Sequence, residues 1–301
     1  MMKIMVVGPG RVGTALAVAM QQAGHDIVGA LSRRTTGLQA DLFKQLTSAP
    51  VYQFPSTDVK PTTDLQLIAP PRMGVPDVFL LTVPDKAVTQ TAQTLAGAGY
   101  FDNVEVIIAH CAGSMSAKAL SPANQPGVRR LCWHPLQSIA DPRMSPACFE
   151  GVTFTLDGDK EAVAAAKKWV TGLKGLPVEI AGEDRTRYHA AAVLAANAMT
   201  ALAATAASVS GLEHGMTALL PLMRGAVGNI ERFGLPDALT GPVERGDVET
   251  VEAHLKSLQD NPTAFDVYRV LGKATLDIAR QKGSLTEQQL SAFLTLFSPG
   301  K

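Results

Sequence analysis

The stretch that decides the fold is "KIMVVGPGRVGTALAVAMQQAG", residues 3–24. It opens with a short apolar run typical of a buried strand, and its second half has apolar residues at helical spacing. Between the two, Gly8, Gly10 and Gly13 form a G-x-G-x-x-G motif. A second apolar run, "HDIVGAL", follows at residues 25–31. Strand, glycine turn, helix and strand in this order predict a dinucleotide-binding unit.

Each glycine has its own physical role in such a turn. Gly8 permits the tight turn, Gly10 lets the backbone approach a pyrophosphate, and Gly13 lets the helix pack on the strand. The amides of Arg11 and Val12, at the start of the helix, are then placed to bind the anion. The alternative is a glycine-rich turn with a purely structural role.

The end of the second predicted strand distinguishes the two nicotinamide dinucleotides. An NAD site usually carries an acidic residue there, which accepts hydrogen bonds from the ribose hydroxyls. This chain has Ser32, Arg33 and Arg34 instead. Because guanidinium groups bind phosphate through paired charge-assisted hydrogen bonds, the sequence predicts NADP(H) over NAD(H). The alternative is that the arginines are solvated loop residues.

Strands and helices continue to alternate through the first half, after a variable connection at residues 38–76. This pattern predicts an α/β fold with a parallel, doubly wound sheet, in a Rossmann-like domain over residues 1–182. The expected later elements are strands at 78–83, 104–109 and 129–135, a further strand in "GVTFTLDGD", a helix at 160–173 and a last strand in "PVEIA".

Ligands of such sheets bind at the carboxyl ends of the strands. Val83 and Pro84 follow one predicted strand, and His110 follows the next. We expect these three residues to contact the cofactor. Ser114 and His134, which also follow strand ends, are candidates for the substrate side of the site.

The second half, residues 183–301, has a purely helical pattern and is predicted to be an all-helical domain. It begins with an alanine-rich run at residues 188–210, which we expect to be a buried central helix. The loop "LPDALTGPVERGD" carries Thr240, Arg245 and Asp247 just before a helix. Such a loop is suited to an anionic substrate, and its alternative is a capped turn with a local Arg–Asp pair.

Four stretches together carry a family resemblance: "GPGRVG", "HPLQS", "YHAAAVLAAN" and "LTGPVERGD". They resemble bacterial Rossmann-like proteins with a DUF2520 C-terminal domain. These in turn are similar to pyrroline-5-carboxylate reductase, to 6-phosphogluconate and 3-hydroxyacid dehydrogenases, and to ketopantoate reductase. The resemblance implies an NADP-binding domain, a helical C-terminal domain like that of 6-phosphogluconate dehydrogenase, a homodimer, and a small substrate between the domains. It favours ketopantoate as that substrate.

The resemblance also implies a role for the start of the alanine-rich helix. In the ketopantoate and hydroxyacid enzymes this helix carries a proton-donating lysine, with asparagine one turn and sometimes two turns later. Here His189, Val193 and Asn197 stand at these positions, so Val193 departs from the family pattern. An imidazolium can donate a proton to a developing alkoxide, which makes His189 the candidate donor. Asn197, roughly 12 Å further along a helix, is too far to act on the same atom, so we assign it an orienting role.

The sequence therefore predicts an NADP-dependent reductase of a small anionic carbonyl compound, with Arg245 as a carboxylate clamp. Two alternatives stay open. One is reduction of a cyclic imine in the manner of pyrroline-5-carboxylate reductase, and the other is a dinucleotide-binding sensor without turnover.

Composition argues against several other classes of protein. Lys and Arg together number 27, as do Asp and Glu, so no basic surplus predicts a nucleic-acid partner. The three cysteines lack a CxxC spacing, which favours reduced thiols in a cytoplasmic protein, and the histidines lack metal-ligand spacing. Polar residues interrupt the alanine-rich run, and the chain opens directly on a strand, so we expect neither a membrane span nor a secretory signal.

Overall fold

The computed structural model describes residues 1–55 and 76–298 of the 301-residue chain. The chain divides into two compact units, Met1–Val193 and Leu194–Lys301, which are described separately below as unit 1 and unit 2. The domain division inferred from the sequence, between residues 182 and 183, stays a prediction. The connection expected at residues 38–76 contains helix α2 (Leu38–Thr47) and strand β3 (Val51–Gln53), and its residues 56–75 lie outside the described part.

Unit 1 is built on an eight-stranded sheet with the order β3-β2-β1-β4-β5-β6-β7-β8. All neighbouring strands are parallel except β6 and β7. The predicted doubly wound α/β fold is thus confirmed, with one antiparallel pair near the far edge. The remaining strands are β1 (Lys3–Val7), β2 (Asp26–Ser32), β4 (Val78–Leu81), β5 (Val106–His110), β6 (Val128–Pro135), β7 (Thr153–Gly158) and β8 (Leu176–Glu179).

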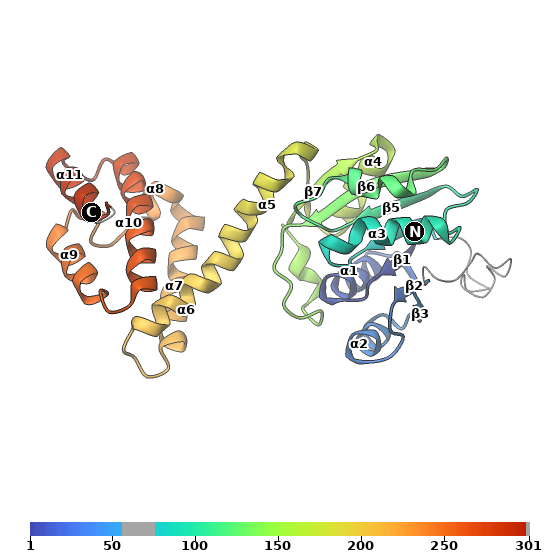
Figure 1. Cartoon of the computed structure of the whole chain (residues 1–301), viewed down its shortest axis with the longest axis horizontal. Helices are drawn as coiled ribbons and strands as arrows, with labels where there is room; N and C mark the ends of the chain where they lie inside the picture. Colours follow the sequence, from blue (N-terminus) through green and yellow to red (C-terminus); the bar gives the residue numbers. More distant parts are fainter. Residues whose placement is uncertain (56–75, 299–301) are drawn as a thin grey trace. The chain divides into compact units, whose positions relative to one another are not determined.

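Helices cover both faces of this sheet (Figure 1). Helices α1 (Arg11–Gln22), α2 and α4 (Lys160–Gly172) pack on one face, and α3 (Val88–Gly97) and the 3-10 helix η3 (Ala117–Ala123) pack on the other. Successive β1 side chains enter the two cores in turn. A strand buried on both faces needs an apolar residue at every position, which explains the uninterrupted runs in the sequence.

Unit 2 is entirely helical in its described residues, which confirms the predicted class of the C-terminal domain. Its small core is formed mainly by α9, α10 and α11. Asp247 and Thr286 cap α9 and α11 with their side chains. The helices are α6 (Met199–Val209), α7 (Gly215–Phe233), α8 (Leu235–Ala238), α9 (Val248–Ser257), α10 (Pro262–Lys282) and α11 (Glu287–Leu296).

The alanine-rich segment forms one long helical run, 182–209, that includes α5 (Arg185–Val193), a π-helical turn (Leu194–Ala198) and α6. By length and composition alone it is the one helix among the described residues that could cross a membrane, with a mean hydropathy of 1.6 over its most apolar window. None of that window is buried inside the chain, which differs from the expected buried central helix. Helix α7 is also apolar on its exposed surface, where Leu222 is 70% exposed and Phe233 is 51% exposed.

Candidate active site

The glycine turn between β1 and α1 is shaped by close backbone packing. Gly8 has a φ of +92°, and its carbonyl accepts hydrogen bonds from the Gly10 amide at 2.7 Å and from Oγ1 of Thr82 at 2.6 Å. A Cβ atom on Gly13 would collide with Oγ1 of Thr82 and would lie 2.7 Å from the Gly8 carbonyl oxygen. The fold itself therefore requires glycine at positions 8 and 13.

Gly10 differs, because the protein's own packing does not require a glycine there. Its φ is −81°, and a Cβ atom would meet nothing closer than Oε1 of Gln39, at 3.6 Å. Helix α1 begins at the next residue, and no side chain caps its first amides. A bare backbone before an uncapped helix start fits the pyrophosphate of a dinucleotide, since a side chain at Gly10 would stand in the adjoining groove.

That groove has a volume of about 1140 Å³ and lies along the carboxyl ends of β1, β2 and β4. It brings together seven of the residues predicted to bind the cofactor: Gly8, Gly10, Ser32, Arg33, Arg34, Val83 and Pro84. Arg11, Val12 and Gly13 continue from it into α1. Sequence reasoning missed Lys86 and Gln90, which reach the groove from the segment after β4 and carry no motif of their own.

His110 is not placed to contact a ligand with its ring. The side chain is fully buried, and Nδ1 accepts a hydrogen bond from the Ala112 amide at 3.2 Å. The other nitrogen, Nε2, donates to the carbonyl oxygen of Ser116 at 3.1 Å. Burial lowers the pKa of His110 to about 4, so the ring is neutral near pH 7. Both nitrogens are thus used to shape the loop after β5, whereas the sequence analysis assigned His110 to the cofactor.

A second polar cluster forms where β5 and β6 end and α5 begins. Nδ1 of His134 lies 2.8 Å from the hydroxyl of Tyr188. The rings of His134 and His189 meet edge to face, with centroids 6.0 Å apart. The two histidines singled out from the sequence, 55 positions apart, therefore lie side by side. Ser114 lies on the same loop as Gly113, and its hydroxyl donates to the Asp85 carboxylate at 3.3 Å.

The charge state of His134 is set mainly by burial. Burial is the largest cause that lowers its pKa to about 4, and the neighbouring His189, Arg185 and His110 contribute to the same shift. His134 is therefore neutral near pH 7 and presents one donor and one acceptor nitrogen.

Arg185 anchors the start of α5 to the sheet. Its side chain is fully buried, and its Nε lies 3.4 Å from Oδ2 of Asp157 on β7. Both the hydroxyl and the carbonyl of Thr155 lie 3.5 Å from the guanidinium nitrogens. This anchor fixes the helix turn that carries Tyr188 and His189. Sequence reasoning missed it, because a lone arginine at a helix start gives no signal of burial.

The remaining predicted residues lie in unit 2. Both carboxylate oxygens of Asp247 accept hydrogen bonds from Thr250, so the capped turn considered from the sequence is present. No Arg245–Asp247 ion pair accompanies the cap within the described residues, and Arg245 and Thr240 are exposed. Asn197 is exposed in the π-helical turn. The substrate roles of Thr240, Arg245 and Asp247 and the orienting role of Asn197 stay predictions.

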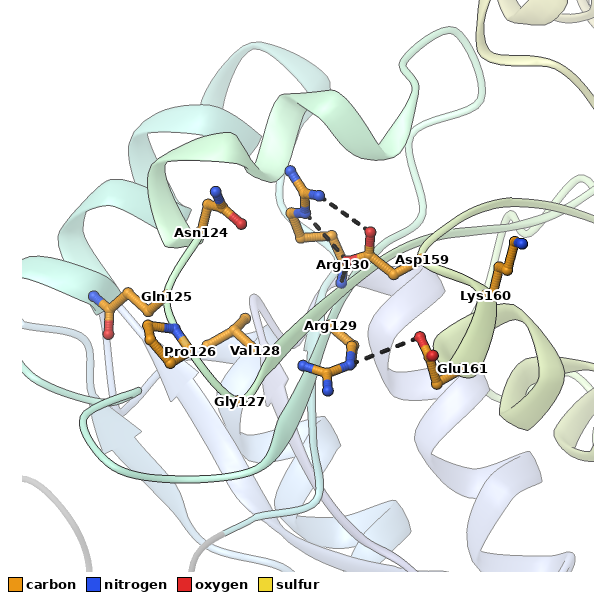
Figure 2. Close-up of a pocket in the computed structure, with 10 residues that line it drawn as sticks. All are labelled: Asn124, Gln125, Pro126, Gly127, Val128, Arg129, Arg130, Asp159, Lys160 and Glu161. Atoms are coloured by element: carbon orange, nitrogen blue, oxygen red, sulfur yellow. Dashed lines mark hydrogen bonds and ion pairs between the residues drawn. The ribbon is translucent and has the colours of Figure 1, made fainter.

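A second hollow, at the opposite end of β6, does not resemble a ligand site (Figure 2). Arg130 binds the Asp159 carboxylate through two guanidinium nitrogens, at 3.1 and 3.2 Å, and Arg129 lies 3.8 Å from Glu161. These cations are matched by carboxylates, so the hollow is better explained as a junction of β6 with α4. No group of three or more metal-ligating side chains occurs among residues 1–55 and 76–298.

The fold defines an α/β protein of the Rossmann-like type with a helical C-terminal unit. Comparison with family models agrees: the Rossmann-like domain matches residues 1–135, and DUF2520, a domain of unknown function, matches residues 152–275. The chain combines these two domains, as the resemblance inferred from its sequence implies. The DUF2520 match begins before β7 and so includes the last part of the sheet in unit 1.

Solved structures share the fold at low sequence identity. A candidate NADP oxidoreductase from Bacteroides fragilis is 23% identical with a TM-score of 0.70, covering 92% of this chain and 98% of its own. Pyrroline carboxylate reductase from Plasmodium falciparum, solved with NADP bound, is 13% identical with a TM-score of 0.55, covering 92% and 98%. A reductive aminase from Aspergillus terreus, in complex with NADPH and ethyl levulinate, is 18% identical with a TM-score of 0.56, covering 99% of each chain. A comparison with curated proteins found no match.

Proposed function

We propose that this protein is a reductase that uses a nicotinamide dinucleotide. The observation that carries the proposal is the glycine at position 10. Neither its φ nor the packing around it requires a glycine, but a residue without a side chain leaves room for a ligand at the uncapped start of α1. Proteins of the same fold whose structures contain NADP or NADPH support it. When bound, the dinucleotide supplies the hydride.

NADP(H) is the cofactor that the groove favours. Ser32, Arg33 and Arg34 line it at the end of β2, where an NAD site would carry a carboxylate. Both arginines are exposed and form no ion pair within the described residues. Their guanidinium groups would hold the 2′-phosphate, and the amides at the start of α1 would hold the pyrophosphate.

His189 is the proton donor in this proposal. It stands on the first turns of α5, beside the loop that follows β5, and ligands of doubly wound sheets bind at the carboxyl ends of the strands. As an imidazolium it would give a proton to the oxygen or nitrogen of the group being reduced. Asn197 would orient the substrate or the nicotinamide, and Arg245 would bind a substrate carboxylate.

The substrate is a small anionic compound, and ketopantoate is the first candidate because of the sequence resemblance. The second is a cyclic imine, which the name of one of the compared proteins, pyrroline carboxylate reductase, favours. An imine can arrive already protonated, so an enzyme that reduces it depends less on a side-chain acid. A dinucleotide-binding sensor without turnover is the alternative from a different class.

We further propose that two copies of the chain pair through the exposed apolar surface of unit 2. Leu194 and Leu222 are each 70% exposed, and many other apolar side chains of α6 and α7 are also exposed. Apolar surface of this extent usually marks an interface. A partner of the same chain would remove it from water, which fits a cytoplasmic protein better than a membrane span does.

A panel assay tests the proposed function. NADPH oxidation is followed with purified protein and, in turn, ketopantoate, other 2-keto acids, 3-keto acids and cyclic imines. We expect turnover on at least one member, with NADPH preferred over NADH. Tight NADPH binding with no oxidation on any member would instead support the sensor.

A further inference from the structure

His189 has one buried nitrogen without a partner. Its Nδ1 is shielded from water and forms no hydrogen bond among the residues that the structure describes. A buried polar atom left unpaired is destabilising, so an explanation in terms of function is warranted. Since His189 is the proposed proton donor, the partner of this nitrogen matters for its chemistry.

The position of Gly113 indicates that His134 is that partner. A Cβ atom built on Gly113 would lie 2.5 Å from Nδ1 of His189 and 2.8 Å from Nε2 of His134. Both nitrogens therefore approach the same side of Gly113, where a side chain would collide with both rings. Gly113 does not have a positive φ, so glycine is not needed there for the backbone. Its role is to leave space between the two rings.

His134 has a second ring nitrogen that can accept a hydrogen bond from His189. Its Nδ1 is engaged with the Tyr188 hydroxyl at 2.8 Å, which leaves Nε2 facing Gly113. Burial lowers the pKa of His134 to about 4, so it stays neutral beside a protonated His189. The charged or titratable groups around it are His110 from β5, Arg185 and His189 from α5, and Asp157 from β7, which is paired with Arg185.

We propose that His134 is the positioning residue for His189: it accepts the Nδ1–H hydrogen of His189 through Nε2, directly after a small ring rotation or through one water. Its own Nδ1–H then donates to the Tyr188 oxygen. The inference rests on the proposed function, because it assigns the acid of that reaction.

The arrangement determines which proton is transferred. In the protonated state His189 carries hydrogens on both nitrogens, and its Nδ1–H is held by His134. The Nε2 proton is therefore the one given to the substrate atom, and His189 is left neutral with its hydrogen on Nδ1. Solvent then returns a proton to Nε2. A base oriented by a third group is the usual architecture of histidine catalysis.

The test compares His134→Leu, which removes the acceptor, with His134→Gln, whose amide oxygen can still accept. Nitrogen-15 NMR of histidine-labelled protein reports which ring nitrogen of neutral His189 carries the hydrogen. We expect Nδ1–H in the wild type and in His134→Gln, and a shift toward Nε2–H in His134→Leu. The same His189 tautomer in wild type and His134→Leu would overturn the proposal.

Kinetics supply an independent second readout. His134→Leu is expected to lower kcat by about 10- to 100-fold with little change in KM, as for other residues that orient a catalytic group, and His134→Gln should recover most of it. Equal losses in both variants would overturn the positioning role. The NMR measurement of the tautomer does not need turnover. If no substrate is reduced, the proposed function is contradicted, and the NMR result still tests the positioning role of His134.

Discussion

The hydroxyl of Tyr188 lies 2.8 Å from Nδ1 of His134, and this contact joins the start of α5 to the carboxyl end of β6. It places the neighbouring residue, His189, against the loop that follows β5. Arg185 strengthens the same junction one turn earlier through Asp157. The polar residues of a helix rich in alanine are thus held by the sheet, and the predictions below test what each part of this arrangement contributes.

The glycine turn gives a prediction that separates folding from binding. Gly10→Ala should leave the free energy of unfolding nearly unchanged, because its Cβ has room, but should weaken NADPH binding by about 10- to 100-fold. Gly13→Ala should destabilise the fold, since its Cβ would collide with Thr82. Thermal unfolding and NADPH titration by fluorescence check both.

Gly97→Ala is the matched control for the glycine turn. Gly97 ends α3, and a Cβ there would meet nothing within 4 Å. It should bind NADPH like the wild type and be stabilised by up to about 1 kcal/mol. Unchanged NADPH affinity in Gly10→Ala would contradict the assignment of the groove.

The two arginines after β2 should determine the choice of cofactor. Arg33→Ala and Arg34→Ala are each expected to weaken NADPH binding by about 10-fold or more, with much less effect on NADH, because a charge-assisted contact to the 2′-phosphate is lost. Lys168→Ala, which removes an exposed charge on α4, is the control for net charge. Equal losses of affinity for NADPH and NADH would show that the arginines do not bind the 2′-phosphate.

Removing only Arg185 from its ion pair with Asp157 should destabilise the folded protein. Arg185→Met is expected to reduce the free energy of unfolding by about 3–5 kcal/mol, because the half-buried Asp157 carboxylate loses its cationic partner and keeps, within the described part of the chain, only the hydrogen bond from the Ala117 amide. The double variant Arg185→Met, Asp157→Asn should recover part of this loss. Urea unfolding of the wild type, the single variants Arg185→Met and Asp157→Asn, and the double variant measures the coupling. A double variant whose loss of stability equals the sum of the two single losses would exclude it.

Two histidines with lowered pKa values, His110 and His134, predict a loss of stability in mild acid. The pKa values of His110 and His134 are lowered to about 4 in the folded protein, below the ordinary value of 6.5. Between those values the unfolded chain binds more protons than the folded one, so stability falls as the pH drops from about 6.5 to about 4. Each histidine contributes on the order of 1–3 kcal/mol to this fall.

Glutamine variants isolate this effect from that of the carboxylates. His110→Gln and His134→Gln do not titrate in this range, so each should lose less stability than the wild type between pH 7 and pH 4.5 in urea unfolding. A wild-type pH dependence in both variants would show that other groups are responsible.

The exposed surface of α7 should hold two copies together. Leu222→Asp and Phe233→Asp are expected to shift the protein from dimer to monomer in light scattering coupled to size exclusion, because a charge would be buried at the interface. Leu176→Asp, at an exposed apolar position on β8, is the control. A wild-type protein that is monomeric at all concentrations would contradict the pairing.

Local pattern was sufficient to predict the sheet except for its edge strand β3, which lies in the stretch expected to be a variable connection. The glycine motif and the apolar run before it specify the turn by short-range sterics, and Ser32 to Arg34 follow β2 directly. The antiparallel pairing of β6 and β7 could not be predicted, because it depends on the path of residues 136–152. The burial of Arg185 and His110 also depends on tertiary packing, which places one against β7 and folds a loop around the other.

The exposure of the alanine-rich helix could not be predicted from its sequence either. Its composition suggested a buried element, yet none of its most apolar window is buried within the chain. The meeting of His134 and His189 likewise depends on the sheet that brings residues 55 positions apart together.

The most direct test of the central claim compares wild-type protein and His189→Ala in the NADPH oxidation panel, with NADPH affinity measured in parallel. We expect the wild type to reduce at least one keto acid or cyclic imine. His189→Ala should lower kcat on a keto substrate by about 100-fold or more while binding NADPH normally. Wild-type rates in His189→Ala would contradict the proton-donor role, and NADPH binding without turnover on any substrate would contradict the reductase itself.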